Sequence, residues 1–214
     1  MKITLGLAAL AGLGAAAPTD LDKRQTGSTA NELSGPCRPV TFIFARGSTE
    51  TGNLGTIIGP PVSNGLKARY GAGNIATQGV NYAALLTTNF IPNGGDPQGI
   101  QDMKNQLTTA ANKCPNTKIV AGGYSQGAAI THQAIETLSA AVRNRIVAAV
   151  TFGDTQNLQD GGRIPNYPPA NTRIFCALGD PVCVGTLIIN VAHLSYGVDA
   201  GPAVSFLSSK IGNI

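Results

Sequence analysis

The sequence predicts an α/β fold: a three-layer α/β/α sandwich around a mainly parallel five-stranded sheet. Strand-like segments alternate with segments of helical periodicity along most of the chain. The strand-like segments are nearly continuously apolar, which is typical of parallel strands covered on both faces. The chain has 214 residues, 43% of them hydrophobic and 12% charged, so it is long enough for one domain with a substantial core.

Five segments have the apolar and β-branched composition expected of buried strands. They lie at residues 40–45, 74–80, 117–123, 145–153 and 172–178. Helices are expected between or after them. Within residues 99–114, apolar and small side chains recur at spacings of three and four, at Met103, Leu107, Ala110, Ala111 and Cys114. Further helices are predicted at 126–138 and 202–211, and within 53–70, where Pro60 and Pro61 break or begin the helix.

The N-terminal segment predicts secretion. Residues 1–16 begin with Lys2, continue as a short apolar run and end in small residues, as a signal peptide does. The run is too short to span roughly 30 Å of hydrocarbon. Residues 17–24 end in Lys23-Arg24, which we interpret as the end of a propeptide or, alternatively, as part of a solvated linker. Residues 25–214 then form a single extracellular domain, expected to be a monomer.

Charge and cysteine content exclude several functions. The formal charge is only +4, without a cluster of basic and aromatic residues, which argues against nucleic-acid binding. No later segment is long and apolar enough to insert into a membrane. Four cysteines in a secreted chain suggest two disulfides with three possible connectivities, of which we favour Cys37–Cys114 and Cys176–Cys183. With no CxxC motif and two histidines, neither a metal nor a cofactor is expected.

The stretch "GGYSQGA" at residues 122–128 contains the most informative serine of the chain. Ser125 lies where a predicted strand turns into a predicted helix, with Gly123 and Gly127 two residues away on either side. At such a sharp turn larger side chains would collide, and the serine hydroxyl stands above the sheet as a nucleophile. The N–H of Gln126 begins the helix without an intrahelical partner and is therefore a candidate donor to an oxyanion.

A serine nucleophile needs a base, and the sequence offers two histidines. His132 follows Ser125 by two helical turns, which places it roughly 10 Å away. It cannot reach the hydroxyl, so a surface or core-packing role is expected. His193 remains as the base, and it lies after the last predicted strand in the chain order Ser…Asp…His.

The acidic partner of the base has two candidates. Asp180 follows the strand predicted at 172–178, inside a loop that the Cys176–Cys183 disulfide would enclose. Asp154 also follows a strand and remains a rival, but Asp180 is favoured; Asp199 comes after the base and breaks the chain order. A second oxyanion donor is expected from the loop after the first strand, where Ser48 lies in "ARGSTE".

Four motifs together resemble the fungal cutinases, secreted serine esterases of the α/β-hydrolase superfamily. They are "FARGSTE", "AGGYSQGAA", "NTRIFCALGDPVC" and "AHLSYG", and the resemblance covers about residues 37–211. It implies a small lidless α/β-hydrolase with catalytic Ser125, Asp180 and His193 and oxyanion donors Ser48 and Gln126. It further implies that Asn89 orients Ser48, and it supports the favoured cysteine pairing. Asp154 departs from the family, because an aromatic residue is common there.

The predicted activity is hydrolysis of cutin-type polyesters and fatty-acyl esters through an acyl-enzyme. No insertion is long enough for a lid, and an apolar rim is predicted at Leu85, Leu86, Val182, Leu187, Ile188 and Leu194, although each could instead belong to the core. One alternative is an acetylxylan-type polysaccharide esterase, disfavoured because the chain lacks tryptophan and has five tyrosines. Another is a catalytically silent, secreted surface-binding protein, against which the Ser/Asp/His set argues.

Overall fold

The sheet has five strands, all paired in parallel, in a computed structural model that describes residues 25–214. The expected signal peptide and propeptide lie outside the described residues. The strands follow the order β2-β1-β3-β4-β5, so the chain starts near the middle of the sheet and builds outward in both directions. They are β1 (Val40–Ala45), β2 (Ile75–Gly79), β3 (Lys118–Tyr124), β4 (Ile146–Phe152) and β5 (Thr172–Phe175).

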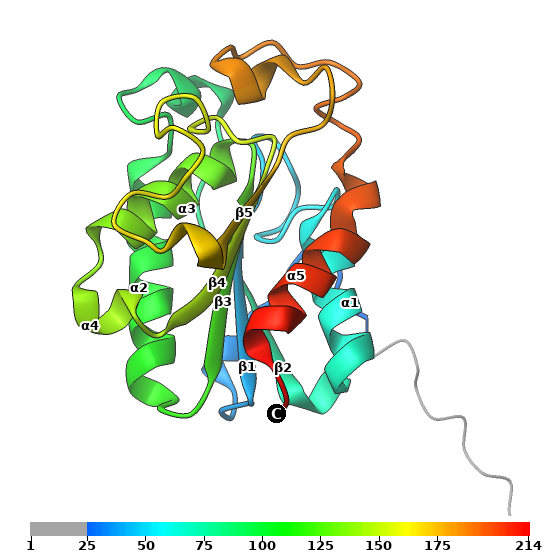
Figure 1. The fold of residues 1–214 in the computed structure, drawn as a ribbon, viewed down its shortest axis with the longest axis vertical. Coiled ribbons are helices and arrows are strands. Elements are labelled where there is room, and N and C mark those ends of the chain that lie inside the picture. Colours follow the sequence, from blue (N-terminus) through cyan, green and yellow to red (C-terminus); the bar gives the residue numbers. More distant parts are fainter. Residues whose placement is uncertain (1–24) are drawn as a thin grey trace, which may run out of the picture.

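Helices cover both faces of the sheet, which gives the three layers that the sequence predicts. In Figure 1, α1 and α5 lie on one side of the sheet, and α2, α3 and α4 lie on the other. The α-helices are α1 (Gly59–Tyr70), α2 (Pro97–Lys113), α3 (Gln126–Thr137), α4 (Ala140–Arg143) and α5 (Ala200–Ile211). Short 3-10 helices are η2 (Glu32–Ser34), η3 (Ala72–Asn74), η4 (Leu86–Phe90), η5 (Pro169–Asn171), η6 (Pro181–Val184) and η7 (Tyr196–Asp199).

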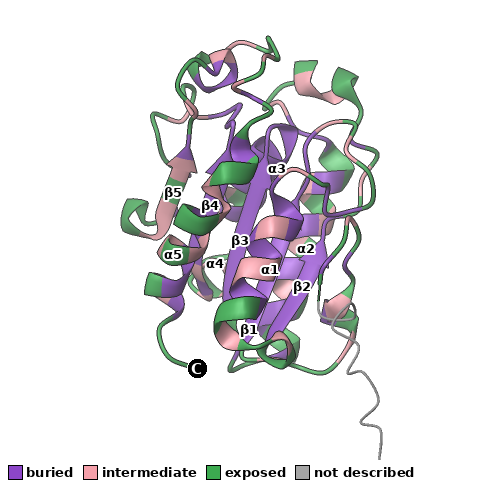
Figure 2. Ribbon diagram, turned by 90° about the vertical axis from the view of Figure 1, so that its right-hand side faces the viewer, coloured by how far each residue is buried: buried purple, intermediate pink, exposed green. Residues whose placement is uncertain are grey.

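The core consists of two apolar layers, one on each face of the sheet. Alternate residues of β1 point to opposite faces. Phe42 and Phe44 pack with Leu207 of α5, whereas Ile43 and Ala45 pack in the second layer with Met103 of α2. Figure 2 shows β1 to β4 mostly buried and the edge strand β5 only partly buried, whereas the helices carry exposed outer faces. This double covering explains why the strand segments are continuously apolar.

Element boundaries differ from the predicted ones where local contacts decide them. Helix α1 begins at Gly59, so both prolines occupy its first turn, where a missing N–H costs nothing. Helix α2 begins at Pro97, because the Asp96 side chain caps it by accepting from the N–H of Gln98 at 2.8 Å. Strand β5 ends at Phe175, opposite Phe152, the last residue of β4. Because β4 ends there, residues 176–178 have no strand to pair with. Leu178 is fully exposed.

Two disulfides connect the described residues, Cys37 to Cys114 and Cys176 to Cys183. This is the connectivity that the sequence analysis favours. The first joins the segment before β1 to the end of α2, and the second closes the loop that carries Asp180. Within residues 25–214, no helix combines the length and hydropathy needed to cross a membrane.

Candidate active site

Ser125 occupies the sharp turn between β3 and α3 in a strained backbone conformation. Its φ is +54°, a value rare for residues other than glycine. The flanking glycines are required by space. A Cβ on Gly123 would lie 2.0 Å from the carbonyl oxygen of Gly127, and a Cβ on Gly127 would lie 2.0 Å from that of Ala45. The Gly-x-Ser-x-Gly spacing is therefore a packing requirement of this turn.

Three side chains from distant parts of the chain meet at the carboxyl edge of the sheet. Ser125 Oγ lies 3.0 Å from Nε2 of His193, and Nδ1 of the same ring lies 2.9 Å from Oδ2 of Asp180. Ser125 follows β3, Asp180 follows β5, and His193 lies in the loop before η7. The geometry matches a serine nucleophile beside a base whose second nitrogen is held by a carboxylate.

Two tyrosines that the sequence analysis did not single out support this arrangement. The hydroxyl of Tyr196 donates to Asp180 Oδ2 at 2.6 Å, and that of Tyr124 donates to the carbonyl of His193 at 2.8 Å. Burial, together with nearby acidic groups, raises the pKa of both phenols, so they remain donors. The Tyr124 ring stacks on the imidazole with centroids 5.2 Å apart. The one signal in the sequence for these roles is proximity to the predicted site residues. Tyr124 directly precedes Ser125, and Tyr196 lies in the motif "AHLSYG" with His193.

The rival acidic residue has a different partner. Asp154 is completely buried, and its Oδ2 lies 2.9 Å from Nε2 of His132, so it does not serve His193. His132 is also completely buried, but its surroundings are not those of a surface or apolar packing residue. Its Nδ1 lies 2.6 Å from Oδ2 of Asp160. The geometry therefore assigns Asp180 to His193 and places Asp154 in a separate ionic cluster.

The predicted oxyanion donors lie beside the serine. Gln126 is the first residue of α3, and its side chain donates to the carbonyl of Leu85 at 2.8 Å and to Thr88 Oγ1 at 2.6 Å. Asn89 Nδ2 donates to Ser48 Oγ at 2.9 Å. The amide side chains thus connect the η4 turn to both predicted donors, whereas the sequence analysis considered only the backbone of Gln126.

A mainly apolar cavity of about 510 Å³ opens at Ser125 and His193. Its walls come from the loop after β1, from η4 and from the loop before η7. The apolar lining residues are Ile57, Leu86, Phe90, Val182, Leu187, Ile189 and Leu194. The walls belong to the connections of the sheet itself, so among the described residues no inserted domain covers the serine.

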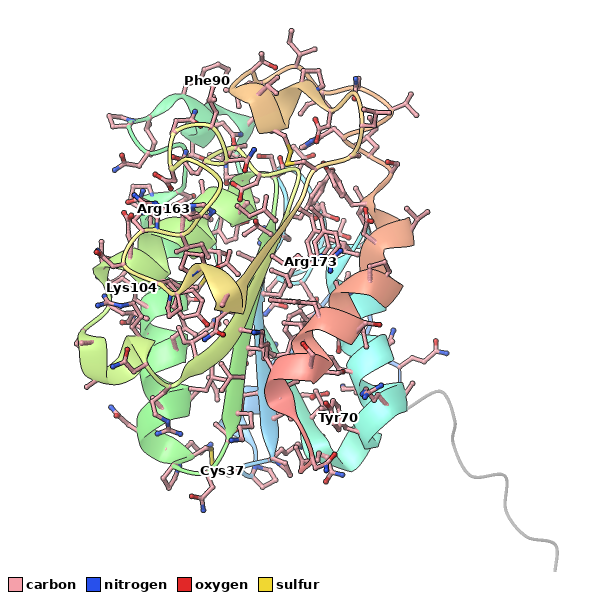
Figure 3. The ribbon with its side chains drawn as sticks, viewed as in Figure 1. Cys37, Tyr70, Phe90, Lys104, Arg163 and Arg173 are labelled. Carbon is pink, nitrogen blue, oxygen red and sulfur yellow. A yellow bond between two sulfur atoms is a disulfide. The ribbon has the colours of Figure 1, made fainter. Side chains whose placement is uncertain are left out.

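Most of the predicted apolar rim is exposed around this cavity. Leu85, Leu86, Leu187, Ile188 and Leu194 are exposed, as are Phe90, Val184, Ile189 and Val191, which the sequence analysis did not include. Figure 3 shows Phe90 at the end of the molecule opposite Cys37, extending to solvent. Val182 is only 1% exposed, so its assignment to the exposed rim is wrong. It lies in η6, where its N–H donates to Asp180 Oδ1 and its side chain lines the inner cavity.

Comparisons with known proteins identify the family of the chain. A family model described as Cutinase matches residues 36–211. The probable cutinase 1 of Aspergillus niger is 52% identical over 189 residues, which cover 87% of this chain and 72% of that protein. The probable cutinase 3 of Neosartorya fischeri is 50% identical over 97% of both chains.

Solved structures extend the comparison to the fold. A Trichoderma reesei cutinase in complex with a C11Y4 phosphonate inhibitor has a TM-score of 0.78 at 36% identity, covering 87% of this chain and 81% of its own. An acetylxylan esterase covers 83% of this chain with a TM-score of 0.65, but at 23% identity that likeness shows only the α/β-hydrolase-like fold. Because the family model and close relatives span nearly all of the described residues, the chain belongs to the cutinase family and is an ester hydrolase of the cutinase-type serine esterases.

Proposed function

We propose that this esterase is a secreted enzyme that cleaves cutin-type polyesters and fatty-acyl esters through Ser125, His193 and Asp180. The observation that carries the proposal is the continuous series of contacts from Ser125 Oγ to His193 at 3.0 Å and on to Asp180 at 2.9 Å, at the mouth of an apolar cavity. Residues 25–214 are the mature enzyme in this proposal, after removal of the signal peptide and propeptide.

The reaction follows from the roles of the three side chains. Ser125 Oγ attacks the ester carbonyl while His193 Nε2 takes its proton. Asp180 accepts from Nδ1–H and thereby keeps Nε2 free to act as the base. When the tetrahedral intermediate collapses, the C–O bond breaks and His193 returns the proton to the leaving alcohol. Water then attacks the acyl-enzyme, with His193 again as the base, and releases the acid and the serine.

The negative oxygen of the intermediate needs donors that are already in place. The backbone N–H groups of Gln126 and Ser48 are assigned to this role, assisted by the Ser48 hydroxyl. Asn89 holds that hydroxyl through the 2.9 Å contact from its Nδ2. A single donor of this kind contributes roughly 3 kcal/mol to transition-state stabilisation.

The substrate class is inferred from the surface around the cavity. Exposed apolar side chains flank the serine on two loops, Leu86 and Phe90 on one and Ile188 and Leu194 on the other. A surface of this kind favours an acyl chain or an insoluble polyester over a polysaccharide. Three of the five tyrosines cannot stack on a sugar ring. Tyr124 and Tyr196 are buried against His193, and Tyr167 is buried in the core.

Two comparisons test this proposal. Ser125→Ala should abolish hydrolysis of p-nitrophenyl esters and of a cutin-like polymer while circular dichroism remains unchanged; retained turnover would refute the assignment of the nucleophile. The native enzyme should release acid from the polymer faster than acetate from acetylated xylan. Faster release from xylan would favour the polysaccharide esterase, and no turnover of any ester would favour a silent binding protein.

A further inference from the structure

A completely buried histidine of α3 lies between two carboxylates, and none of the three residues lines the active-site cavity. His132 Nε2 is 2.9 Å from Asp154 Oδ2, and His132 Nδ1 is 2.6 Å from Asp160 Oδ2. The side chains of His132 and Asp154 have no solvent exposure, and that of Asp160 is 18% exposed. Asp154 also accepts from Thr151 Oγ1 at 2.6 Å and from the N–H of Gln156 at 2.8 Å.

This geometry favours a charged ring over a neutral one. A neutral imidazole has one N–H, so its other nitrogen would direct a lone pair at a carboxylate, whereas an imidazolium donates to both. Burial alone would lower the pKa of His132, but the two carboxylates raise it to about 9. The same contact holds the pKa of Asp154 below its ordinary value despite complete burial. Glu136, also on α3, is a further acidic group that interacts with Asp160 and His132.

The segment held by His132 forms part of the wall around the active site. A Cβ on Gly153 would lie 2.6 Å from Cε1 of His193, so the Gly153 backbone lies close against that ring. Thr155 lines the cavity beside Ser125, and its hydroxyl lies 3.5 Å from the serine carbonyl. Residues 153–155 therefore contact both Ser125 and His193.

The same segment connects to the two loops that border the cavity. Gln156 Nε2 donates to the carbonyl of Asn93 at 3.1 Å, beyond η4. Asn157 Nδ2 donates to the carbonyl of Cys183 at 3.0 Å, in the loop that carries Asp180. A shift of residues 153–160 would therefore move the surroundings of all three proposed catalytic side chains.

We propose that the charged imidazole of His132 is a positioning residue of the active site: it holds Asp154 and Asp160, and with them residues 153–160, against α3. By fixing this segment it keeps the His193 ring at Ser125. The inference rests on the proposed function, and it adds a second histidine that acts on the reaction only through the position of the first.

Three variants of the full chain test the proposal. His132→Gln removes the charge that joins both carboxylates. Asp160→Asn keeps a hydrogen bond to Nδ1 of His132 whether the imidazole is charged or neutral. The amide oxygen can accept from a charged ring, and the amide NH2 can donate to a neutral one. Lys67→Gln is the matched control, because Lys67 forms another ion pair of a mostly buried side chain, 2.7 Å from Glu32, on the opposite face of the sheet.

Steady-state kinetics on a soluble p-nitrophenyl ester should separate these variants, measured well below each melting temperature. For His132→Gln we expect kcat to fall about tenfold or more with KM little changed, since displaced reacting groups cost rate rather than binding. The kcat of the native enzyme should decline above about pH 9 as His132 loses its proton. This decline should be absent in Asp160→Asn. Lys67→Gln should lose stability but keep the native kcat and pH profile.

Each of the other outcomes overturns the proposal. Native kcat and an unchanged pH profile in His132→Gln would show that the cluster has no effect on the reaction. An equal loss of kcat in Lys67→Gln would show that the effect is general destabilisation. If His132→Gln does not fold, the native profile and Asp160→Asn still decide, because a decline that persists in Asp160→Asn contradicts the proposal. These outcomes can be told apart from a failure of the proposed function. In that case the native enzyme would not react with a phosphonate at Ser125, whatever the His132 variants do.

Discussion

Gly153 lies so close to His193 that an added Cβ would be 2.6 Å from Cε1 and 2.8 Å from Nδ1 of the ring. The residue has a φ of +52°, so a side chain there would be strained as well as crowded. The backbone of the loop after β4 therefore forms one wall of the site that holds the imidazole.

Gly153→Ala should displace the His193 ring from Ser125. We expect kcat to fall about tenfold or more, with a smaller change in KM, because the ring moves while the acyl cavity remains. Gly161→Ala is the matched control: its φ is +64°, but an added Cβ would have no neighbour within 4 Å. Equal losses of kcat in both variants, measured on the same p-nitrophenyl ester, would show that backbone strain and not contact with His193 is responsible.

Tyr196→Phe should reduce activity by removing the donor to Asp180 Oδ2 at 2.6 Å while keeping the ring in the core. The loss of a buried hydrogen bond to a charged group should cost about 2 kcal/mol of stability and lower kcat several-fold. Tyr167→Phe removes another buried hydroxyl, which donates to the carbonyl of Ile146 at 2.9 Å, at the first residue of β4 and thus at the end of that strand away from the proposed catalytic residues. Urea unfolding should show a lower free energy of unfolding for both variants, whereas kcat should fall only for Tyr196→Phe. A native kcat in Tyr196→Phe would show that this hydroxyl does not contribute to the reaction.

Asn89→Ala should weaken the proposed oxyanion donor Ser48, because Asn89 Nδ2 no longer orients its hydroxyl. We expect kcat to fall about tenfold while KM stays within a factor of about two, since the contact strengthens only as charge develops on the substrate. Asn105→Ala, at an exposed position of α2, is the control and should leave both parameters unchanged. A change in KM alone would indicate that Asn89 contacts the bound substrate rather than Ser48.

Stability should decrease with alkaline pH because of His132. The pKa of His132 is raised from 6.5 to about 9 in the folded protein, so the unfolded chain loses this proton first. The contribution is complete below about pH 6.5, falls as the pH rises from there, and is lost above about pH 9, with a total of up to about 3 kcal/mol. Urea unfolding at a series of pH values should show this slope in the native chain and a smaller one in His132→Gln. Identical slopes would contradict a charged His132.

The layers of the fold and the turn at Ser125 could be predicted because local sequence determines them. Continuous apolar strands indicate a covered parallel sheet, and the spacing of Gly123 and Gly127 around Ser125 follows from steric exclusion at one turn. The end of β5 could not be predicted, since it depends on where the neighbouring strand β4 ends, and residues 176–178 are no less strand-like than those before them.

The choice between the two acidic candidates shows where local sequence is insufficient. Asp180 and Asp154 each follow a strand at the same edge of the sheet, and in the nearby sequence only the expected Cys176–Cys183 disulfide favours Asp180. What separates them is α3, which brings His132 to Asp154, while the loop after β5 brings Asp180 to His193. The contributions of Tyr196 and of the Gln126 side chain likewise depend on contacts between segments distant in the chain.

The central claim is that Ser125 is a nucleophile activated by His193. Treatment of the native chain with a fluorescent phosphonate, followed by mass spectrometry of the peptide that contains residues 122–128, measures this directly. The account predicts one phosphonyl group, on Ser125, and labelling slowed by about a thousandfold or more in His193→Gln. An adduct on another residue, or an equal labelling rate in His193→Gln with its fold intact, would contradict it.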